Sequence, residues 1–222
     1  MTRWWQLARE NTSGVLLIAQ LGAILAYPFF GDSTSGRMVI GVVGMVIVLL
    51  SVWAVRATPA LTWVAVLFGV PALMLTVWES FDPTNRGVVV ASAMFHTPFY
   101  LFVSYAMIRY LFADRKVTSD DLLATGAAFT VVAWAFAYVF SGVQAIWPGS
   151  FAGVSDGPVR SWFELLFASF ANLTGVGLSD VVPVLPHARS VVMVEQVTGV
   201  LYIALVISRL VGLTVTRDHA AR

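Results

Sequence analysis

The clearest chemical signal in the sequence is a loop with two glycines, Thr174-Gly175-Val176-Gly177-Leu178-Ser179-Asp180. It follows a short amphipathic segment, Trp162–Leu173, which is shorter than the about 20 residues that a spanning helix needs. We predict that this segment is a re-entrant half-helix. Non-helical backbone at membrane depth is tolerated inside protein or along a water-filled space. The bare carbonyls of such a loop need a polar partner, and a dehydrated cation is one of few candidates. The negative C-terminal end of the half-helix also favours a cation there.

Nucleophilic chemistry is a weaker interpretation of the same residues. The Gly177-Leu178-Ser179 pattern suggests a reactive serine, which needs a histidine base within hydrogen-bond reach. The last apolar segment, Ser190–Val215, contains no histidine, and His187 is eight residues away in a loop with two prolines. The sequence also contains no cysteine, which excludes disulfides and thiolate metal sites. We therefore expect neither an enzyme nor a bound cofactor.

Isolated polar and small residues inside apolar segments are further candidates. Glu195 lies in the last segment, and an intramembrane carboxyl is either functional or a buried acid that supports the structure behind the loop. Gly199 is either a hinge or a small residue that allows close helix packing. His96 precedes Thr97-Pro98, where it could satisfy a backbone group that the proline frees.

Composition places these residues in a membrane. The chain has 222 residues, of which 59% are hydrophobic and 11% are charged. Soluble domains are closer to a quarter charged, and a fold of this size cannot bury so much apolar surface. The formal net charge of +1 gives no electrostatic case for nucleic acid. The expected solvent for the apolar residues is a lipid bilayer.

Six segments are long and apolar enough to cross a bilayer, with turn residues between them. They are Ser13–Phe30, Met38–Val55, Ala60–Trp78, Val88–Phe112, Leu122–Ser141 and Ser190–Val215. The sequence thus predicts an all-α membrane protein with six transmembrane helices, plus the half-helix and its loop. No inverted repeat supports a secondary transporter.

Basic residues predict the orientation, because they gather on the cytoplasmic side. With the N-terminus inside, the inner side holds nine of the 13 Lys and Arg residues: Arg3, Arg9, Arg56, Arg109, Arg115, Lys116, Arg209, Arg217 and Arg222. The outer side holds Arg37, Arg86, Arg160 and Arg189. Both termini are therefore expected in the cytoplasm, with the half-helix and loop toward the outside.

The stretch from about Leu122 to Leu213 resembles the pore module of the potassium channel superfamily, whose filter reads Thr-Thr-Val-Gly-Tyr-Gly-Asp. Four of the seven filter positions agree, namely Thr174, Val176, Gly177 and Asp180, and Ser169 in the half-helix also fits. Residues 182–190 resemble the filter exit of bacterial two-helix channels. Their inner helix is matched at Glu195, Gly199, Leu201, Tyr202, Arg209 and Leu210.

Three filter positions depart from this pattern. Gly175 stands where the family has a threonine whose hydroxyl forms the innermost ion site. Leu178 replaces a tyrosine that braces the filter, and Phe167 and Ala168 stand where many members place the aromatic partners of that tyrosine. Ser179 replaces a glycine in a left-handed conformation, which costs an L-residue roughly 1–2 kcal/mol. We expect these changes to alter selectivity and to relax it.

The resemblance implies a homotetrameric channel that passes potassium or another monovalent cation passively. Thr174, Gly175, Val176, Gly177 and Leu178 would line the filter, with Ser179 and Asp180 at the outer mouth and Glu195 and Gly199 in gating or filter support. Asp180 would concentrate cations there, unless it is an ordinary solvated carboxylate. The alternative is a pore-like structural membrane subunit that conducts poorly or not at all.

The region before the predicted pore module lacks the signature of a voltage sensor. Six spanning segments with the pore last is the voltage-gated arrangement, but Val88–Ile108 contains no Lys or Arg. Without gating charges a helix draws little free energy from the membrane field. We predict that residues 1–116 form a four-helix region that does not sense voltage and that residues 117–222 form the pore module. A bacterial-type inner membrane or a plasma membrane is the expected location.

Overall fold

The structure is a computed structural model that describes residues 12–30, 34–54, 59–113, 119–154, 157 and 159–220. Its helices are α2 (Thr12–Phe30), α3 (Thr34–Ala54), α4 (Pro59–Phe81), α5 (Arg86–Ala113), α6 (Ser119–Ile146), α7 (Trp162–Leu173) and α8 (Pro186–Ala220). Two short strands, β1 (Phe151–Ala152) and β2 (Val182–Pro183), pair antiparallel. Apart from this strand pair, the fold is the predicted all-helical one.

Five helices are long and apolar enough to cross a membrane, judged by length and composition over the described residues. These spans are Ser13–Phe30, Trp63–Phe81, Arg86–Arg109, Leu122–Ile146 and Pro186–Arg209. The remaining predicted span, Met38–Val55, corresponds to α3. The apolar stretch of α3 within the described residues, Thr34–Val46, is shorter than a span. That α3 crosses the membrane, and that there are six transmembrane helices, therefore remain predictions. α8 begins at Pro186 rather than at Ser190, because proline fits the first turn of a helix.

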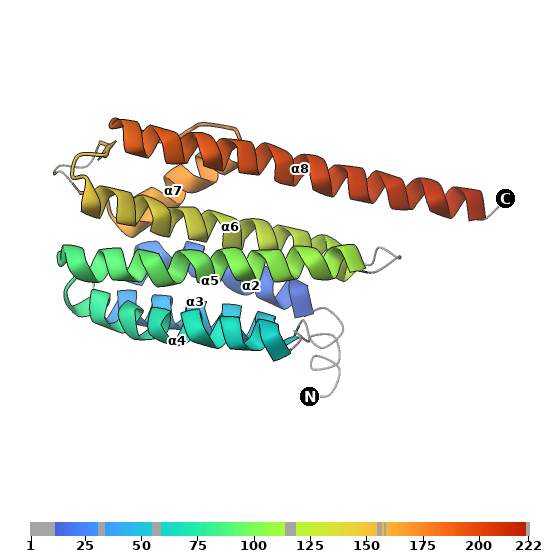
Figure 1. Cartoon of the computed structure of the whole chain (residues 1–222), viewed down its shortest axis with the longest axis horizontal. Helices are drawn as coiled ribbons and strands as arrows, with labels where there is room; N and C mark the ends of the chain where they lie inside the picture. The colour runs from blue at the N-terminus through green and yellow to red at the C-terminus, as the bar shows by residue number, and fades with distance from the viewer. Residues whose placement is uncertain are drawn as a thin grey trace.

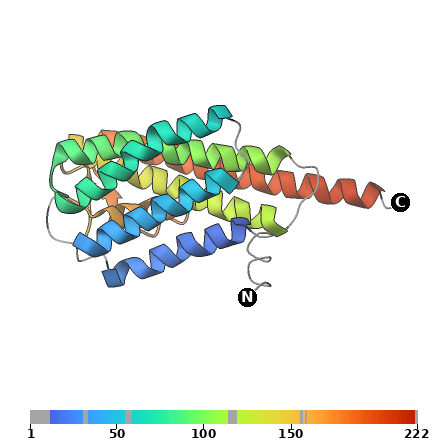
Figure 2. The same ribbon diagram turned by 90° about the horizontal axis from the view of Figure 1, so that it is seen from below.

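The helices α2 to α6 form a closed ring of neighbours. α2 packs on α3, α3 on α4, α4 on α5 and α5 on α6, while α6 returns to contact α2. Figures 1 and 2 show this bundle, with α7 and α8 on the other side of α6. α6 is consequently the central element: 67% of its apolar span is buried, against 17% for α8.

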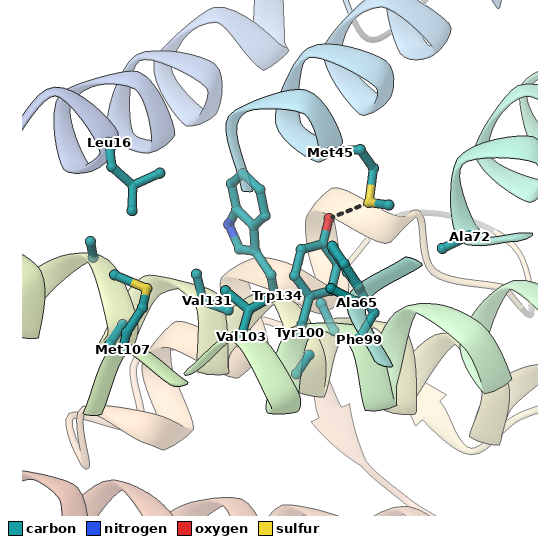
Figure 3. Close-up of a cluster of buried hydrophobic side chains, with 14 of the residues drawn as sticks. Leu16, Met45, Ala65, Ala72, Phe99, Tyr100, Val103, Met107, Val131 and Trp134 are labelled. Carbon is teal, nitrogen blue, oxygen red and sulfur yellow. Dashed lines mark hydrogen bonds between the residues drawn. The ribbon is translucent and has the colours of Figure 1, made fainter. Parts of the chain in front are cut away.

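An aromatic core joins α3, α5 and α6 inside this ring (Figure 3). The Tyr100 hydroxyl donates to Met45 Sδ at 3.4 Å. The ring of Trp134 meets Tyr100 edge-on, with centroids 5.8 Å apart. A Cβ at Gly44 would lie 3.3 Å from the same indole, so a glycine lets α3 approach α6 closely. The first four described helices are thus packed onto α6 rather than forming a separate unit.

A buried polar network joins α4 to α5 near this core. The Nδ1 atom of His96 lies 2.8 Å from the Ser92 carbonyl oxygen, and its Nε2 atom lies 2.9 Å from the Thr76 hydroxyl. Because a carbonyl can only accept, Nδ1 carries the proton in its contact with Ser92. The Thr76 hydroxyl also lies 3.0 Å from the Ala72 carbonyl oxygen, to which it donates. The expectation that His96 serves a backbone group freed by Pro98 is therefore not met. α5 runs through Pro98 as one helix.

Two earlier predictions fall partly outside the described residues. The proposed boundary between residues 116 and 117 lies in 114–118, and most basic residues used for the orientation lie in undescribed segments or have undescribed side chains. α2 begins and α8 ends toward the same end of the molecule, while α7 lies toward the other (Figure 1). That arrangement fits the predicted topology, in which both termini share one side.

Candidate functional site: the half-helix and its exposed carbonyl loop

The half-helix α7 begins at a capping box that the sequence analysis missed. The Ser161 hydroxyl accepts from the Glu164 N–H at 3.2 Å, and Glu164 Oε2 accepts from the Ser161 N–H at 2.6 Å. The Ser-x-x-Glu spacing before an apolar run is the signal that could have revealed it. This reciprocal pair defines where α7 starts.

Arg160 anchors that start to the end of α6. Its backbone N–H donates to Gln144 Oε1 at 2.9 Å, and its carbonyl accepts from Gln144 Nε2 at 2.8 Å. Its guanidinium lies 3.7 Å from Glu164 and donates to the Gly157 carbonyl. The side chain is only 2% exposed. The residue before the α7 cap is thus bonded both to Gln144 of α6 and to Glu164 in the first turn of α7.

The end of α7 is capped by the loop itself. The N–H groups of Thr174, Gly175 and Gly177 donate to the carbonyls of Phe170, Asn172 and Ala171 at 3.1, 3.1 and 2.9 Å. Gly175 has φ 74°, the left-handed conformation common just after a helix C-cap. The backbone conformation at this position favours glycine. A threonine at 175 would be strained, because β-branched residues rarely adopt a positive φ.

Four carbonyls of the loop remain free. Among the described residues, the carbonyls of Thr174, Gly175, Val176 and Leu178 accept no hydrogen bond, whereas that of Gly177 accepts from the Ser179 N–H at 3.0 Å. The side chains of Val176 and Leu178 are 63% and 75% exposed. A single chain therefore presents unpaired carbonyls and uncovered apolar side chains on the same short loop.

The loop exit is tied back to the end of α6. The Ser179 hydroxyl accepts from the Val181 N–H at 3.0 Å, which gives this serine a local bond that glycine would lack. Phe151 pairs with Pro183 in the β1–β2 ladder, and His187 stacks on Trp147 with ring centroids 4.0 Å apart. Asp180 remains exposed between these contacts. The strand pair was not predicted, because two residues are too few for a periodic signal.

A polar contact joins α7 to α6 and α8. The Ser169 hydroxyl, on α7, is 2.8 Å from the Ala133 carbonyl of α6 and hydrogen-bonds Glu195 Oε1 of α8. Ser169 and Glu195 are both fully buried, and Glu195 Oε2 has no partner among the described residues. Three helices thus meet at one hydroxyl, and the supporting interpretation of Glu195 agrees with this geometry.

Gly199, one turn further along α8, lies against the end of α7. A Cβ at this position would overlap the Leu173 carbonyl oxygen and lie 2.8 Å from the carbonyl carbon. Leu173 is the last residue of α7 and is 1% exposed. The close-packing interpretation of Gly199 therefore agrees with the structure, and both α8 candidates lie against α7.

The chemistry available at this site is coordination by main-chain oxygens. The described residues contain no group of three or more His, Asp or Glu side chains that could hold a metal ion. The loop offers instead the unpaired carbonyls of four exposed residues between 174 and 178. Carbonyl oxygens of this kind replace the hydration shell of a cation in selectivity filters.

The length and apolar composition of the helices agree with an integral membrane protein that is mostly helical, and one comparison with known proteins gave a match. Residues 126–215 match a family model described as "Ion channel", which covers most of α6, all of α7 and the loop, and most of α8. The match supports an ion-channel family of the potassium-channel type and a role in transport. The matched range agrees closely with the stretch identified from the sequence. No curated protein and no solved structure matched the chain.

Proposed function

We propose that this protein is a homotetrameric, potassium-type cation channel through which monovalent cations pass passively. Four copies of Thr174–Leu178 would line the axis, with Ser179 and Asp180 at the outer mouth. The observation that carries the proposal is the loop with four unpaired carbonyls at the end of a buried half-helix. Within a membrane such groups need a partner, and a ring of four loops around a cation supplies one.

Exposed apolar side chains support assembly from several copies. Val176 and Leu178 project from the loop uncovered, and α8 has further exposed apolar side chains at Met193, Val194, Val197, Val200 and Leu201. One flank of α8 can face lipid, but a loop beside an ion path cannot. Neighbouring copies would cover Val176 and Leu178, because one loop cannot enclose an ion.

Filter support is the role proposed for Glu195 and Gly199. The Ser169–Glu195 contact braces the middle of α7, and Gly199 lets α8 pack on its last residue. Together they hold the half-helix against α8. We propose that this bracing replaces part of the support that tyrosine gives the filter in the resembling family.

Selectivity is proposed to be weaker than in channels with the full filter sequence. Leu178 offers no phenol to anchor the outer carbonyls, and Gly175 adds no hydroxyl ring at the inner end. The Ser179 N–H bond to the Gly177 carbonyl also turns one potential ligand toward its own chain.

The deciding experiment is ion flux into liposomes containing the purified protein, with separate potassium and sodium gradients. Uptake of both ions above protein-free liposomes, with modest preference for potassium, is the expected result. Leu178→Tyr should increase the potassium preference. Gly22→Ala, in α2 with nothing within 4 Å of the new Cβ, is the matched control and should leave flux unchanged. A protein that forms tetramers yet gives no flux would instead support the non-conducting subunit.

The proposed orientation has both termini in the cytoplasm of a bacterial-type or plasma membrane. The native sequence contains no cysteine, so single cysteines can be introduced without background. Asp82→Cys, in the α4–α5 turn, should react with a membrane-impermeant maleimide added to intact cells. Arg109→Cys, near the other end of α5, should react only after the cells are opened. The reverse pattern would overturn the orientation.

A further inference from the structure

A cavity of about 700 Å³ lies within the ring of α2–α6 and is bounded on one side by the first turn of α7. Ligand pockets in proteins commonly range from about 300 to 1,000 Å³. The residues that line the cavity come from the helices α2 to α7 and from the turns that follow α4 and α6. It is separate from the carbonyl loop, which contributes none of its lining.

Aromatic rings form much of the cavity wall. Tyr27, Tyr100, Trp134, Tyr138 and Trp162 all line it. Tyr138 is held by stacking on His96, with centroids 4.0 Å apart, and Tyr27 stacks on Phe163 at 4.3 Å. The faces of such rings carry negative potential and attract cations within about 6 Å.

Glu79 of α4 brings a carboxyl group to the same cavity. It forms no salt bridge among the described residues. Arg160 and Glu164 also line the cavity, but they pair with each other at 3.7 Å. Arg86 also lines the cavity but lies exposed at the start of α5, and it forms no salt bridge with Glu79. Of the two acidic residues in the lining, Glu79 is thus the one that no described cation pairs with.

We propose that this cavity binds an organic ammonium ion with an apolar body. Its charged nitrogen would lie at Glu79, and its apolar part would lie between Tyr27, Tyr138 and Trp162. Because Trp162 and Phe163 belong to the first turn of α7, the occupant would also contact the half-helix. The binding itself does not depend on ion conduction, so it can be tested apart from the proposed channel function.

The test is isothermal titration calorimetry on the full protein in lipid nanodiscs, with empty nanodiscs subtracted. Phenethylammonium is the probe, and 2-phenylethanol is its neutral counterpart of the same shape. We expect the cation to bind at least about tenfold more tightly, the size of effect that one ion pair or cation–π contact supplies. Equal binding of the two probes, or no binding of either, would overturn the proposal.

A pair of carboxylate variants identifies the residue responsible. Glu79→Gln keeps the shape of the side chain and should weaken phenethylammonium binding about tenfold. Asp120→Asn changes a carboxylate at the start of α6 that contributes nothing to the cavity lining, and it should leave binding unchanged. Thermal unfolding of both variants confirms that they are folded. If Glu79→Gln is folded and binds like the wild type, Glu79 is not the counter-ion and the proposal fails.

Discussion

The two sides of α6 differ in how their polar groups are paired. Toward α2–α5, the helices close a ring in which polar side chains pair with one another, as His96 does with Thr76 and Ser92. Toward α7 and α8, the carbonyls of four loop residues and one oxygen of Glu195 have no partner among the described residues. The first side also contains buried polar atoms without a partner among the described residues, in Gln20 and Trp134, but these atoms lie inside the packed ring. On the second side, the four unpaired carbonyls belong to residues of an exposed loop.

The comparison extends to how helices approach each other. In the ring, Gly44 makes room for an indole side chain, which can adjust its rotamer. Behind the loop, Gly199 makes room for a backbone carbonyl at the end of α7, which cannot move without shifting the half-helix. Tolerance to substitution should therefore be much lower on the α7–α8 side. The following predictions test that difference, from the largest expected effect to the smallest.

Gly199→Ala should have the largest effect. The new Cβ overlaps the Leu173 carbonyl, and overpacking against backbone should destabilise the protein by about 3 kcal/mol. Thermal unfolding in mild detergent, with native mass spectrometry for assembly, measures this loss. Gly22→Ala in α2 meets no atom within 4 Å and should stabilise the helix by up to about 1 kcal/mol. Equal melting of both variants would contradict the proposed packing difference.

Ser169→Ala should have the next largest effect. It leaves the buried Glu195 carboxyl without its hydroxyl partner, a loss of roughly 1–3 kcal/mol. The double variant with Glu195→Leu removes both polar partners and should recover part of that loss in chemical unfolding. Ser190→Ala removes an exposed hydroxyl bond on α8 and should change stability by less than about 1 kcal/mol. If Ser169→Ala unfolds like Ser190→Ala, the three-helix contact contributes little.

Gly177→Ala tests the loop apart from packing. No atom lies within 4 Å of the new Cβ, so the cost is the positive φ of 70°, roughly 1–2 kcal/mol for an L-residue. We expect a small fall in melting temperature but a large fall in potassium flux, because the loop backbone must shift. A variant that melts lower yet conducts normally would show that these carbonyls do not line the ion path.

Asp180→Asn should have the smallest effect, confined to conduction. An exposed carboxylate raises local cation concentration most when screening is weak, since the Debye length is about 30 Å at 0.01 M salt and about 3 Å at 1 M. Single-channel conductance should therefore fall roughly twofold at low salt and hardly at all at 1 M. Asp82→Asn, in the α4–α5 turn of the ring, is the control and should change neither. Equal effects of the two variants would remove the special role of Asp180.

Much of the fold follows from local features of the sequence. The apolar runs predicted every helix that the structure contains, and the bounds of α7 agree with the predicted half-helix residue for residue. Length and hydropathy suffice for this, because a helix satisfies its own backbone in an apolar solvent. The loop residues were also identified from type and spacing, since glycine and small residues next to a short helix form a local pattern.

The structure adds a reason for one of those residues that the sequence analysis did not give. The absence of a threonine hydroxyl at Gly175 stays an expectation about the ion path, and the structure places this glycine at positive φ immediately after the α7 cap. A sequence does not report φ, and both interpretations predict the same residue type. The capping residues Ser161 and Glu164 were readable from their spacing but were overlooked.

Contacts between distant helices were decided by the tertiary structure alone. Glu195 and Ser169 are 26 positions apart, and no periodicity indicates that their side chains meet at the Ala133 carbonyl. The closing of α2–α5 around α6, and the cavity with Glu79 inside it, likewise depend on which faces of uniformly apolar helices come together. Hydrophobicity cannot select those faces in a membrane, because lipid is as apolar as the helices. Small residues and buried hydrogen bonds select them instead, and these act only once the helices are side by side.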